Sequence, residues 1–587
     1  MSHEQGNIAA LARDPHWLKL LHYTRPVFRS PKSDIISPDF FLSPMGRSNP
    51  EAELLETIKQ LERSKEVYCR FPSRRRWLEK KGFTFPGQTC EAYLEWTRGN
   101  SVKSVSLIFA SGFLGNPASY FGHPLLKFNF KDDKSPLDLM DTAINYGAFT
   151  PPDVGALPYA IFGIFGGYTA GFTSADFFFH RNNYSELELR DLWEYELDLS
   201  SEQVEELVAH LWDLKEAKIT YYFFDDNCAY RMSELLELVI DKKLVSPNAP
   251  FAIPATLFHQ IHEYSLVKEI KLLKSRQTRL KEKVATLNPV ERTHLKKISM
   301  NVDHVQTSDF SSLDASAKSR ILETSLDYFS YRQIGSDELV DLKAARRKLL
   351  LERVKLPPQK TDWKPLSQEP PHQAQRPILT QFSFFHSDRF GNGGSFRLRP
   401  VFYDLISPDA ARPPYSSLTL LDTELNVTEE RLWLKTFNLI SVESLNISHT
   451  GLPGDGGFAW RFKIGADQQN LACRTCTVPR LEFGGGKAWE MTKSLILYAM
   501  IDPRIQSSYQ GSGLASLSPS VAALITFSDD FRVNAMAARR YYLKSGNDSE
   551  EIFLVEGRIG SSRTWDMRLS FQEHIDTRYA VGVGLYW

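Results

Sequence analysis

Cys228 and His123 are the two residues whose types and placement could together carry out covalent catalysis. A cysteine attacks as its thiolate, and the unpaired N–H groups at a helix N-terminus lower the pKa of a thiol placed there. Cys228 follows the buried run ITYYFF and opens the amphipathic stretch CAYRMSELLELVI, with Asn227 as the expected N-cap. The same N–H groups could hold a developing oxyanion. His123 opens an expected strand, so the sequence predicts a Cys/His nucleophilic site with His123 as the general base.

Other interpretations of these residues stay open. A buried cysteine more often serves packing than catalysis. His180, in FFFHRNNY, is a second candidate base. His210 lies beside the apolar stripe of a helix expected to begin at Ser200, a place where histidine is more often a boundary residue.

Hydrophobic patterning divides the 587 residues into five parts with an overall α+β character. In the expected helical regions, apolar residues recur every three or four positions, and at the C-terminal end they alternate. The basic run RFPSRRRWLEKK (70–81) is expected to be solvated surface, with contact to anionic lipid head groups as the alternative. The expected parts are a helical region at 1–100, the Cys/His domain at 101–265, a helical region at 266–355, a proline-rich linker at 356–377 and a β region at 378–587.

The β region is typical of a transmembrane barrel of roughly 10–12 strands. In TWDMRLSFQ, Trp565, Met567, Leu569 and Phe571 share one face, while Asp566 and Arg568 lie on the other. The last strand, RYAVGVGLYW, alternates in the same way to the final residue. A soluble β-sandwich has the same period, but the persistence of the alternation favours an antiparallel outer-membrane barrel with its apolar face toward lipid.

The cysteine count indicates an oxidising compartment. Cys69 with Cys90 and Cys473 with Cys476 could each close a short disulfide loop, which leaves Cys228 as the unpaired thiol. Five reduced cysteines in a cytosolic protein, or a CxxC half of a zinc site without a visible second half, are the alternatives. We expect no cofactor and no metal.

Bulk composition narrows the partners. A formal net charge of −1 gives no reason to expect nucleic acid, which would normally require a basic patch. The first 21 residues lack the apolar core and cleavage site of a signal peptide, so we take the sequence as that of a mature chain.

Five segments resemble the Lnb N-terminal periplasmic domain family, and they occur in the family's order over roughly residues 100–265. The flanking CRFPSRRRWL segment and the β region resemble the longer proteobacterial members. The segments are SLIFASGFLGNPASYFGHPLLKF, INYGA, IFGGYTAGF, YSELELRDLWEYEL and YYFFDDNCAYRMSELLE.

This resemblance implies a fold similar to papain-like thiol enzymes of the NlpC type in permuted order, with the His strand before the Cys helix. The family pattern carries over onto His123 and Cys228. Asn145, in INYGA, is the expected orienting residue, because its strand should pair beside the His123 strand. Tyr120, Asp225 and Asp226 are alternatives for that role, and Asn227, Tyr120 and Asp226 are expected to line the site or hold the oxyanion.

The activity that the resemblance implies is acyl transfer in the envelope. Cys228 would take an acyl chain from a membrane phospholipid and pass it to an amine such as the N-terminus of a lipoprotein, in a periplasmic region attached to an outer-membrane barrel. One alternative is a Cys/His hydrolase, acting as a lipase, an amidase or a peptidoglycan peptidase. Another is a non-enzymatic barrel with a periplasmic interaction domain. We expect Cys228 Sγ and a His123 nitrogen to lie about 3–4.5 Å apart.

Overall fold

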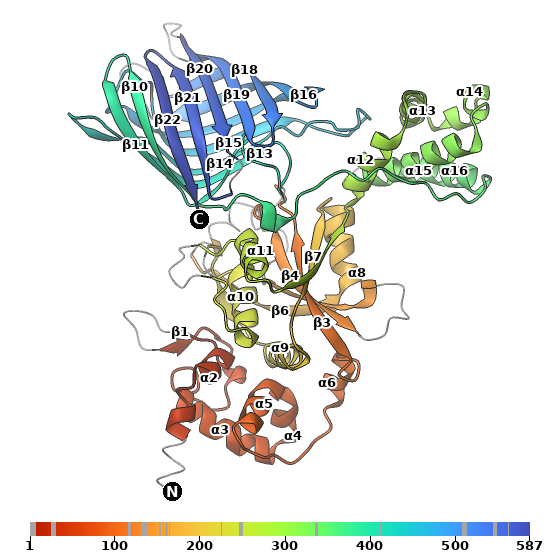
Figure 1. Cartoon of the computed structure of the whole chain (residues 1–587), viewed down its shortest axis with the longest axis vertical. Helices are drawn as coiled ribbons and strands as arrows, with labels where there is room; N and C mark the ends of the chain where they lie inside the picture. The colour runs from red at the N-terminus through yellow and green to blue at the C-terminus, as the bar shows by residue number, and fades with distance from the viewer. Residues whose placement is uncertain are drawn as a thin grey trace. The chain divides into compact units, whose positions relative to one another are not determined.

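The chain forms two compact units, Met1–Leu273 and Lys274–Trp587, shown in Figure 1. The computed structural model describes residues 8–24, 31–114, 119–130, 138–151, 154–155, 158, 162–163, 165–224, 226–245, 251–334, 339–410, 412–507, 513–543, 549–560 and 563–587.

An antiparallel sheet of seven strands is the centre of the first unit, in the order β8-β6-β5-β4-β3-β7-β9. Its middle strands are buried on both faces, so they appear in the sequence as continuous apolar runs. The edge strand β9 lies where a helical region is expected, and that part of the prediction is wrong. Pairing with the open edge of β7 satisfies its backbone groups. The strands are β3 (Val102–Ala110), β4 (His123–Phe130), β5 (Thr142–Ala148), β6 (Tyr168–Asp176), β7 (Leu192–Leu197), β8 (Ile219–Tyr221) and β9 (Val267–Leu273).

Three longer helices accompany this sheet: α9 (Ser201–Asp213), α10 (Cys228–Val239) and α11 (Pro254–Glu263). Ser200 and Gln203 form the expected capping box at the start of α9. Helix α10 packs against β4 and β5 through an apolar face that includes Met232 and Leu235, both fully buried. This packing brings the first turn of α10 to the side of the His123 strand.

Short helices precede the sheet, as the sequence predicts: α2 (Pro15–Leu20), α3 (Pro50–Arg63), α4 (Lys65–Arg70), α5 (Pro72–Lys80) and α6 (Glu91–Trp96). A disulfide between Cys69 and Cys90, with an S–S distance of 1.98 Å, links α4 to the N-terminal end of α6.

The basic run at 70–81 is not simply solvated surface, and this expectation is wrong for Arg74. Its guanidinium is fully buried, 2.6 Å from Glu53 on α3, and it lies over the rings of Phe40 and Phe71. Arg76 pairs with Glu205 on α9 at 2.6 Å. These ion pairs join α5 to α3 and α9, because a buried guanidinium requires both charge and hydrogen-bond partners.

The second unit begins with a helical bundle of α12 (Arg276–Thr286), α13 (Pro289–Met300), α14 (Ser308–Ser311), α15 (Ala315–Arg332) and α16 (Leu339–Val354). Its core includes Leu452 from the β region. The proline-rich segment after α16 is not a free linker, because it packs along α12. The Leu366 N–H donates to Glu282 at 2.9 Å, and Lys283 lies 5.2 Å from the Trp363 ring centre.

The β region closes into a barrel, as predicted. The strands form one antiparallel sheet from β11 round to β12, and the pairing of β11 with β13 closes the ring. Strands β11 and β12, separated only by Pro400, pair with successive parts of β13 and together act as one strand of the barrel. The barrel therefore has 12 strands around its circumference. They are β10 (Leu379–Ser387), β11 (Gly391–Arg399), β12 (Val401–Tyr403), β13 (Ser416–Val427), β14 (Leu432–Ser444), β15 (Ala459–Gln468), β16 (Thr477–Thr492), β17 (Leu495–Gln506), β18 (Ala515–Ser528), β19 (Phe531–Tyr542), β20 (Ser549–Ile559), β21 (Trp565–Glu573) and β22 (Thr577–Tyr586).

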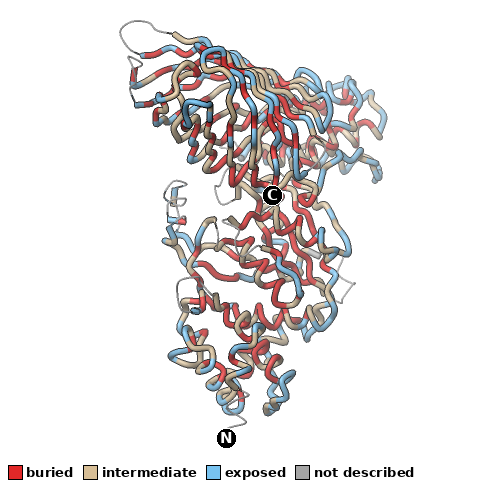
Figure 2. The backbone as a smooth tube through the Cα atoms, turned by 60° about the vertical axis from the view of Figure 1, so that its left-hand side comes forward, coloured by how far each residue is buried: buried red, intermediate tan, exposed pale blue. Residues whose placement is uncertain are grey.

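The two faces of the barrel are assigned as the alternation predicts, and Figure 2 shows the alternation along the strands. Leu569 on β21 and Val581 on β22 are 43% and 45% exposed on the outer surface, whereas Asp566 is completely buried in the lumen. An apolar outer face with a charged lumen is the pattern of a barrel in lipid, not of a soluble sandwich.

The half of the lumen at the end where β10 begins and β22 ends is filled. Two loops pack against inward-facing side chains of β15–β18. The loop after β12 contributes Leu405 and Ile406, and the loop after β14 contributes Leu445 and Ile447. Asp404 pairs with Arg568 on β21 at 2.6 Å, which anchors the first loop across the lumen. We call these two segments, 404–415 and 445–458, the plug loops.

The second expected disulfide is not formed, so that prediction is wrong. Cys473 and Cys476 both remain thiols in the turn between β15 and β16. The Cys476 Sγ lies 3.3 Å from the Cys473 carbonyl oxygen, and the Cys473 Sγ lies 4.0 Å from Thr475 Oγ1. The two thiols also interact with each other, but they are not covalently joined.

Candidate active site

Cys228 is the first residue of α10, as the sequence predicts. The Asn227 side chain caps the helix by accepting hydrogen bonds from the Ala229 and Tyr230 N–H groups at 2.9 and 3.2 Å. Its amide nitrogen donates to the carbonyl oxygens of Phe223 and Ala252 at 3.0 and 2.7 Å. Asn227 therefore fixes the position of Cys228, and its own amide donors are already used by the backbone.

His123 begins β4, and Asn145 lies beside it on β5. The register pairs Leu125 with Asn145, so both side chains are near the same end of the sheet. His123 Nε2 and Asn145 Oδ1 are 2.5 Å apart. An amide oxygen only accepts, so Nε2 carries the proton and Nδ1 is the imidazole nitrogen with a free lone pair. This is the arrangement required of a general base and its orienting residue.

Tyr184 and Arg190 complete the surroundings, and sequence reasoning did not single them out. Tyr184 lies in the π-helix Asn182–Leu187, with its ring centre 6.1 Å from that of His123 and with an electrostatic interaction with Cys228. The Arg190 guanidinium lies 4.8 Å from the Tyr184 ring centre. Both residues belong to the segment YSELELRDLW, and that motif is the sequence feature that could have identified them as site residues.

Arg190 holds the segment that leads to the His123 strand. It is almost fully buried and donates to the carbonyl oxygens of Ser111 and Ala110 at 2.6 and 2.9 Å and to Ser119 Oγ at 3.2 Å. Its charge also lowers the pKa of both Cys228 and His123. Arg190 is thus a positioning residue that brings a positive charge to the site.

Burial keeps both candidate catalytic groups neutral at pH 7. It raises the pKa of the Cys228 thiol to about 12, although the N–H groups of Ala229 and Cys228 oppose the shift. It lowers the pKa of His123 to about 4, partly offset by the hydrogen bond to Asn145. A neutral imidazole is the form that can accept a proton. The expected approach of Cys228 to His123 within about 3–4.5 Å stays a prediction.

The remaining candidates lie in other environments. His180 stacks on Tyr184 at 6.1 Å and lies close enough to affect the charge of His123, so it stays near the site. His210 stacks on His22, with their Nε2 atoms 3.1 Å apart, and belongs to a buried structural group. Asp226 binds Arg231 at 2.5 Å, a structural ion pair. Tyr120 has no hydrogen bond to His123 among the described contacts, and Asp225 lies outside the described residues.

Exposed aromatic side chains gather at the sheet end that carries His123 and Cys228. Phe149 follows β5, Phe162 and Phe165 precede β6, and Tyr222 follows β8. Because these strands are antiparallel neighbours, all four residues lie at the same end of the strands. Their exposed fractions are 46%, 54%, 79% and 38%. We call them the aromatic rim. These four side chains give the described part of this sheet end an apolar surface.

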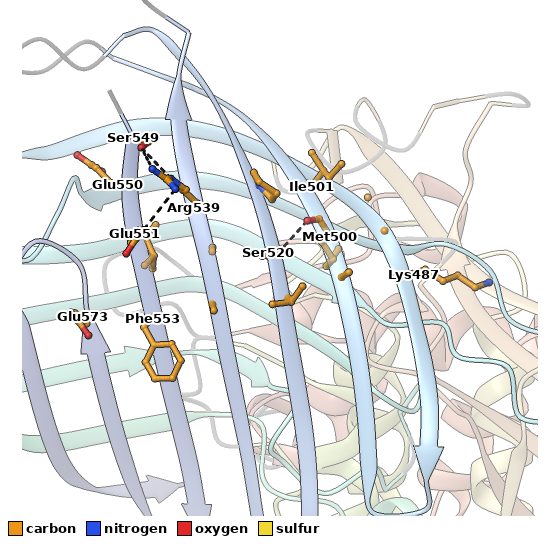
Figure 3. A pocket seen from close by; sticks show the side chains of 18 of the residues that line it. Lys487, Met500, Ile501, Ser520, Arg539, Ser549, Glu550, Glu551, Phe553 and Glu573 are labelled. Carbon is orange, nitrogen blue, oxygen red and sulfur yellow. Dashed lines mark hydrogen bonds and ion pairs between the residues drawn. The ribbon is translucent and has the colours of Figure 1, made fainter. Parts of the chain in front are cut away.

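The outer wall of the barrel carries a shallow groove of about 1,100 Å³ across β16–β20. Val521 is among its lining residues. Figure 3 shows Ile501 and Phe553 in the groove and the hydrogen bond from Arg539 to Ser549. Among the described residues its lining contains no cysteine or histidine. Its exposed apolar side chains belong to the outer face of the barrel.

One possible cation site occurs among the described residues, and it is remote in sequence from Cys228. His294, His304 and Asp309 place three ligand atoms within 4.8 Å of one another. His294 Nδ1 and His304 Nε2 are 2.9 Å apart, and Asp309 pairs with Lys297 at 2.9 Å. The three side chains are therefore already engaged in contacts within the protein. None of the described helices has the length and apolarity needed to cross a membrane.

Comparisons with protein families agree with this division of the chain. Residues 92–263 match the Lnb N-terminal periplasmic domain. Residues 9–81, 274–365 and 368–587 match three domains of unknown function, DUF7843, DUF7842 and DUF7840. A comparison with curated proteins gives no match.

Among solved structures, the barrel region is similar to outer-membrane proteins. The KdgM porin is 12% identical over 36% of this chain and 99% of the porin, with a TM-score of 0.23. Omp33 of Acinetobacter baumannii is 8% identical over 37% of this chain and 100% of its own, with a TM-score of 0.21. An outer membrane channel from Pseudomonas putida F1 is 7% identical over 39% and 99%, with a TM-score of 0.24.

The region with the candidate Cys/His site therefore matches the Lnb N-terminal periplasmic domain over residues 92–263, and the C-terminal region is a closed antiparallel β-barrel with an apolar outer face. The barrel's apolar outer face and the periplasmic family assign the chain to the outer membrane with its N-terminal region in the periplasm.

Proposed function

We propose that this outer-membrane protein, whose periplasmic region is an Lnb N-terminal domain, is a thiol acyltransferase. It would move an acyl chain from a phospholipid, through a thioester on Cys228, to an amine such as the N-terminus of a lipoprotein. The observation that carries the proposal is the hydrogen bond from His123 Nε2 to Asn145 Oδ1 on strands that contact the Cys228 helix. That bond leaves Nδ1 of His123 as a base.

The first half of the reaction forms the thioester. His123 Nδ1 takes the proton of the Cys228 thiol as Sγ attacks the ester carbonyl carbon of the phospholipid. The tetrahedral intermediate collapses, the ester C–O bond breaks, and the lysophospholipid alcohol leaves with the proton held by His123. The Cys228 backbone N–H, which the Asn227 cap does not use, and the charge of Arg190 would stabilise the negative charge that develops.

The second half regenerates the enzyme. The acceptor amine attacks the thioester carbonyl carbon, and His123 takes a proton from the amine. The C–S bond breaks, an amide forms, and Cys228 recovers its proton from His123. No redox partner is needed, because every step exchanges one acyl bond for another.

The aromatic rim favours a lipid as the acyl donor. An open polar cleft would suit peptide, whereas apolar side chains around a buried thiol suit an acyl chain. The rim stands at the same sheet end as the two candidate catalytic residues. A lipid donor is also compatible with a chain that is anchored in the outer membrane.

Intact-protein mass spectrometry tests the proposal directly. The purified full-length protein, incubated in mixed micelles of detergent and phospholipid, should gain the mass of one acyl chain on Cys228, and hydroxylamine should remove it. Adding a lipopeptide with a free N-terminal amine should then yield an N-acylated product. Free fatty acid as the only product would favour the hydrolase instead, and absence of any Cys228 adduct would contradict thiol acyl transfer.

Replacement of Asn145 tests the orienting role. Asn145→Ala removes the acceptor that fixes the His123 tautomer, so we expect the acyl-transfer rate to fall by about 10- to 100-fold, less than the roughly 10²- to 10⁴-fold that a positioned base itself contributes. Asn145→Asp keeps an acceptor and should retain most of the rate. Its negative charge favours the imidazolium and raises the pKa of His123, so the acid limb of the pH–rate profile should move to higher pH. An unshifted limb in Asn145→Asp would argue that Asn145 is merely structural.

Replacement of Phe165 tests the role of the aromatic rim. Phe165→Ser should raise the KM for phospholipid in mixed micelles by roughly tenfold, because burying a phenylalanine is worth about 1.5–3 kcal/mol and about 1.4 kcal/mol corresponds to a factor of ten. The kcat should change little. Phe179→Ser, a change of another largely exposed ring, on α8 (Phe177–Arg181), is the control. Equal KM values for the two variants would remove the rim from substrate binding.

A further inference from the structure

The lumen of the barrel contains a second polar site, far along the chain from Cys228. At the end of the barrel opposite the start of β10 and the end of β22, inward-facing residues of β15–β21 enclose a cavity of about 200 Å³. Its lining includes four arginines, Arg461, Arg480, Arg504 and Arg540, together with Glu482 and His574. The plug loops fill the other half of the lumen, so the lumen is closed at that end and the cavity lies between the plug loops and the opposite end.

Most charges around the cavity have partners. Arg461 pairs with Glu443 at 2.5 Å and with Asp502 at 3.3 Å. Arg480 pairs with Asp467, and His574 binds Glu550 at 2.8 Å. Such mutual pairing is what a desolvated charged layer requires.

Arg504 on β17 departs from this pattern. It is 3% exposed, and its Nε and Nη2 have no hydrogen-bond partner among the described residues. Glu482 is its cross-strand neighbour in the register, yet that carboxylate lies 3.8 Å from Lys463 and 3.7 Å from Arg480. A buried guanidinium edge without acceptors is unfavourable unless something else occupies it.

The two unpartnered atoms of Arg504 also specify a geometry. Nε and Nη2 lie along one edge of the planar guanidinium, and their two parallel N–H bonds match the two oxygens of a carboxylate or phosphate. The Nε atoms of Arg480 and Arg540 are likewise buried without partners, so further donors stand around the same cavity.

We propose that this cavity binds a small oxyanion, held bidentately on the Nε–Nη2 edge of Arg504. The shared chemistry is that of a phosphate or carboxylate group, either free or carried on a larger solute. The periplasmic region precedes β10, so the barrel end where β10 begins and β22 ends faces the periplasm. The opposite end, with the cavity, opens toward the cell exterior. The site would therefore take its ligand from outside the cell.

Calorimetric titration of the purified full-length protein with inorganic phosphate tests the assignment. We expect one phosphate per chain, and Arg504→Gln should weaken the affinity at least tenfold. Arg504→Lys should be intermediate, because an ammonium is a point charge without the bidentate edge. Arg539→Gln, which removes the same charge from the outer face of β19, should bind as the wild type does. No binding by the wild type, or equal binding by Arg504→Gln, would overturn the proposal.

Competition and stability measurements separate a ligand site from other roles. Acetate should displace phosphate, whereas chloride at the same concentration should do so far less; equal displacement by chloride would contradict bidentate recognition. In phosphate-free buffer, Arg504→Gln should unfold at the wild-type temperature or above in a heat-modifiability assay, and phosphate should raise that temperature only for the wild type. A lower unfolding temperature for Arg504→Gln without phosphate would show that Arg504 is structural, and the proposal would fail.

Discussion

Replacement of Cys228 by alanine should abolish acyl transfer and the acyl adduct together. Without the sulfur there is no nucleophile to form the thioester, so the rate should fall by at least about 10⁴-fold, to the background. Because Ala fits the same buried position and Asn227 still caps α10, the fold should persist. The measurement is N-acyl lipopeptide formation by the full-length protein in phospholipid micelles.

The matched control for this variant is Cys473→Ala. Cys473 is a thiol of the barrel turn between β15 and β16, outside the Lnb domain, so its loss should leave the rate unchanged. His123→Ala should resemble Cys228→Ala in rate but should keep the thiol. If Cys228→Ala retained the wild-type rate, the Lnb domain of this chain would not use Cys228, and a non-enzymatic role for it would gain support.

Leu569→Arg should prevent insertion of the barrel into the outer membrane. Leu569 lies in the middle of β21 and faces lipid, where an arginine costs about 2–4 kcal/mol. Ser570→Arg introduces the same side chain one residue later, on the lumen face, and should be much milder. Heat-modifiable migration of outer-membrane fractions measures both. Equal insertion of the two variants would contradict the assignment of the outer face to lipid.

The structure changes what we expect of the neighbouring residue Arg568. From the alternation alone, Arg568→Leu should be mild, because the lumen tolerates many side chains. The guanidinium, however, binds Asp404 of a plug loop at 2.6 Å and the Tyr586 hydroxyl at 2.8 Å. Leucine would leave the half-buried Asp404 and the fully buried Asp566 without this partner, and such a loss is typically costly. We therefore expect Arg568→Leu to insert but to loosen the plug loops.

Local patterns in the sequence were sufficient for several features of the site and the barrel. The position of Cys228 at a helix start follows from Asn227 and the apolar spacing after it, since a cap acts within four residues. The pairing of Asn145 beside His123 follows from the succession of two short strands. The lipid and lumen faces follow from a period of two, which any ten residues of β21 and β22 already display.

Only the tertiary structure decided the features that depend on distant partners. Arg74 is buried because α3 places Glu53 beside it, and Tyr184 reaches His123 because a π-helix turns it toward a strand sixty residues earlier. The lumen's paired charges and the unpartnered edge of Arg504 arise when six or more strands bring their inward residues into one layer. A sequence specifies such contacts only through the whole fold, because the free energy of a buried charge depends on neighbours that the chain supplies from far away.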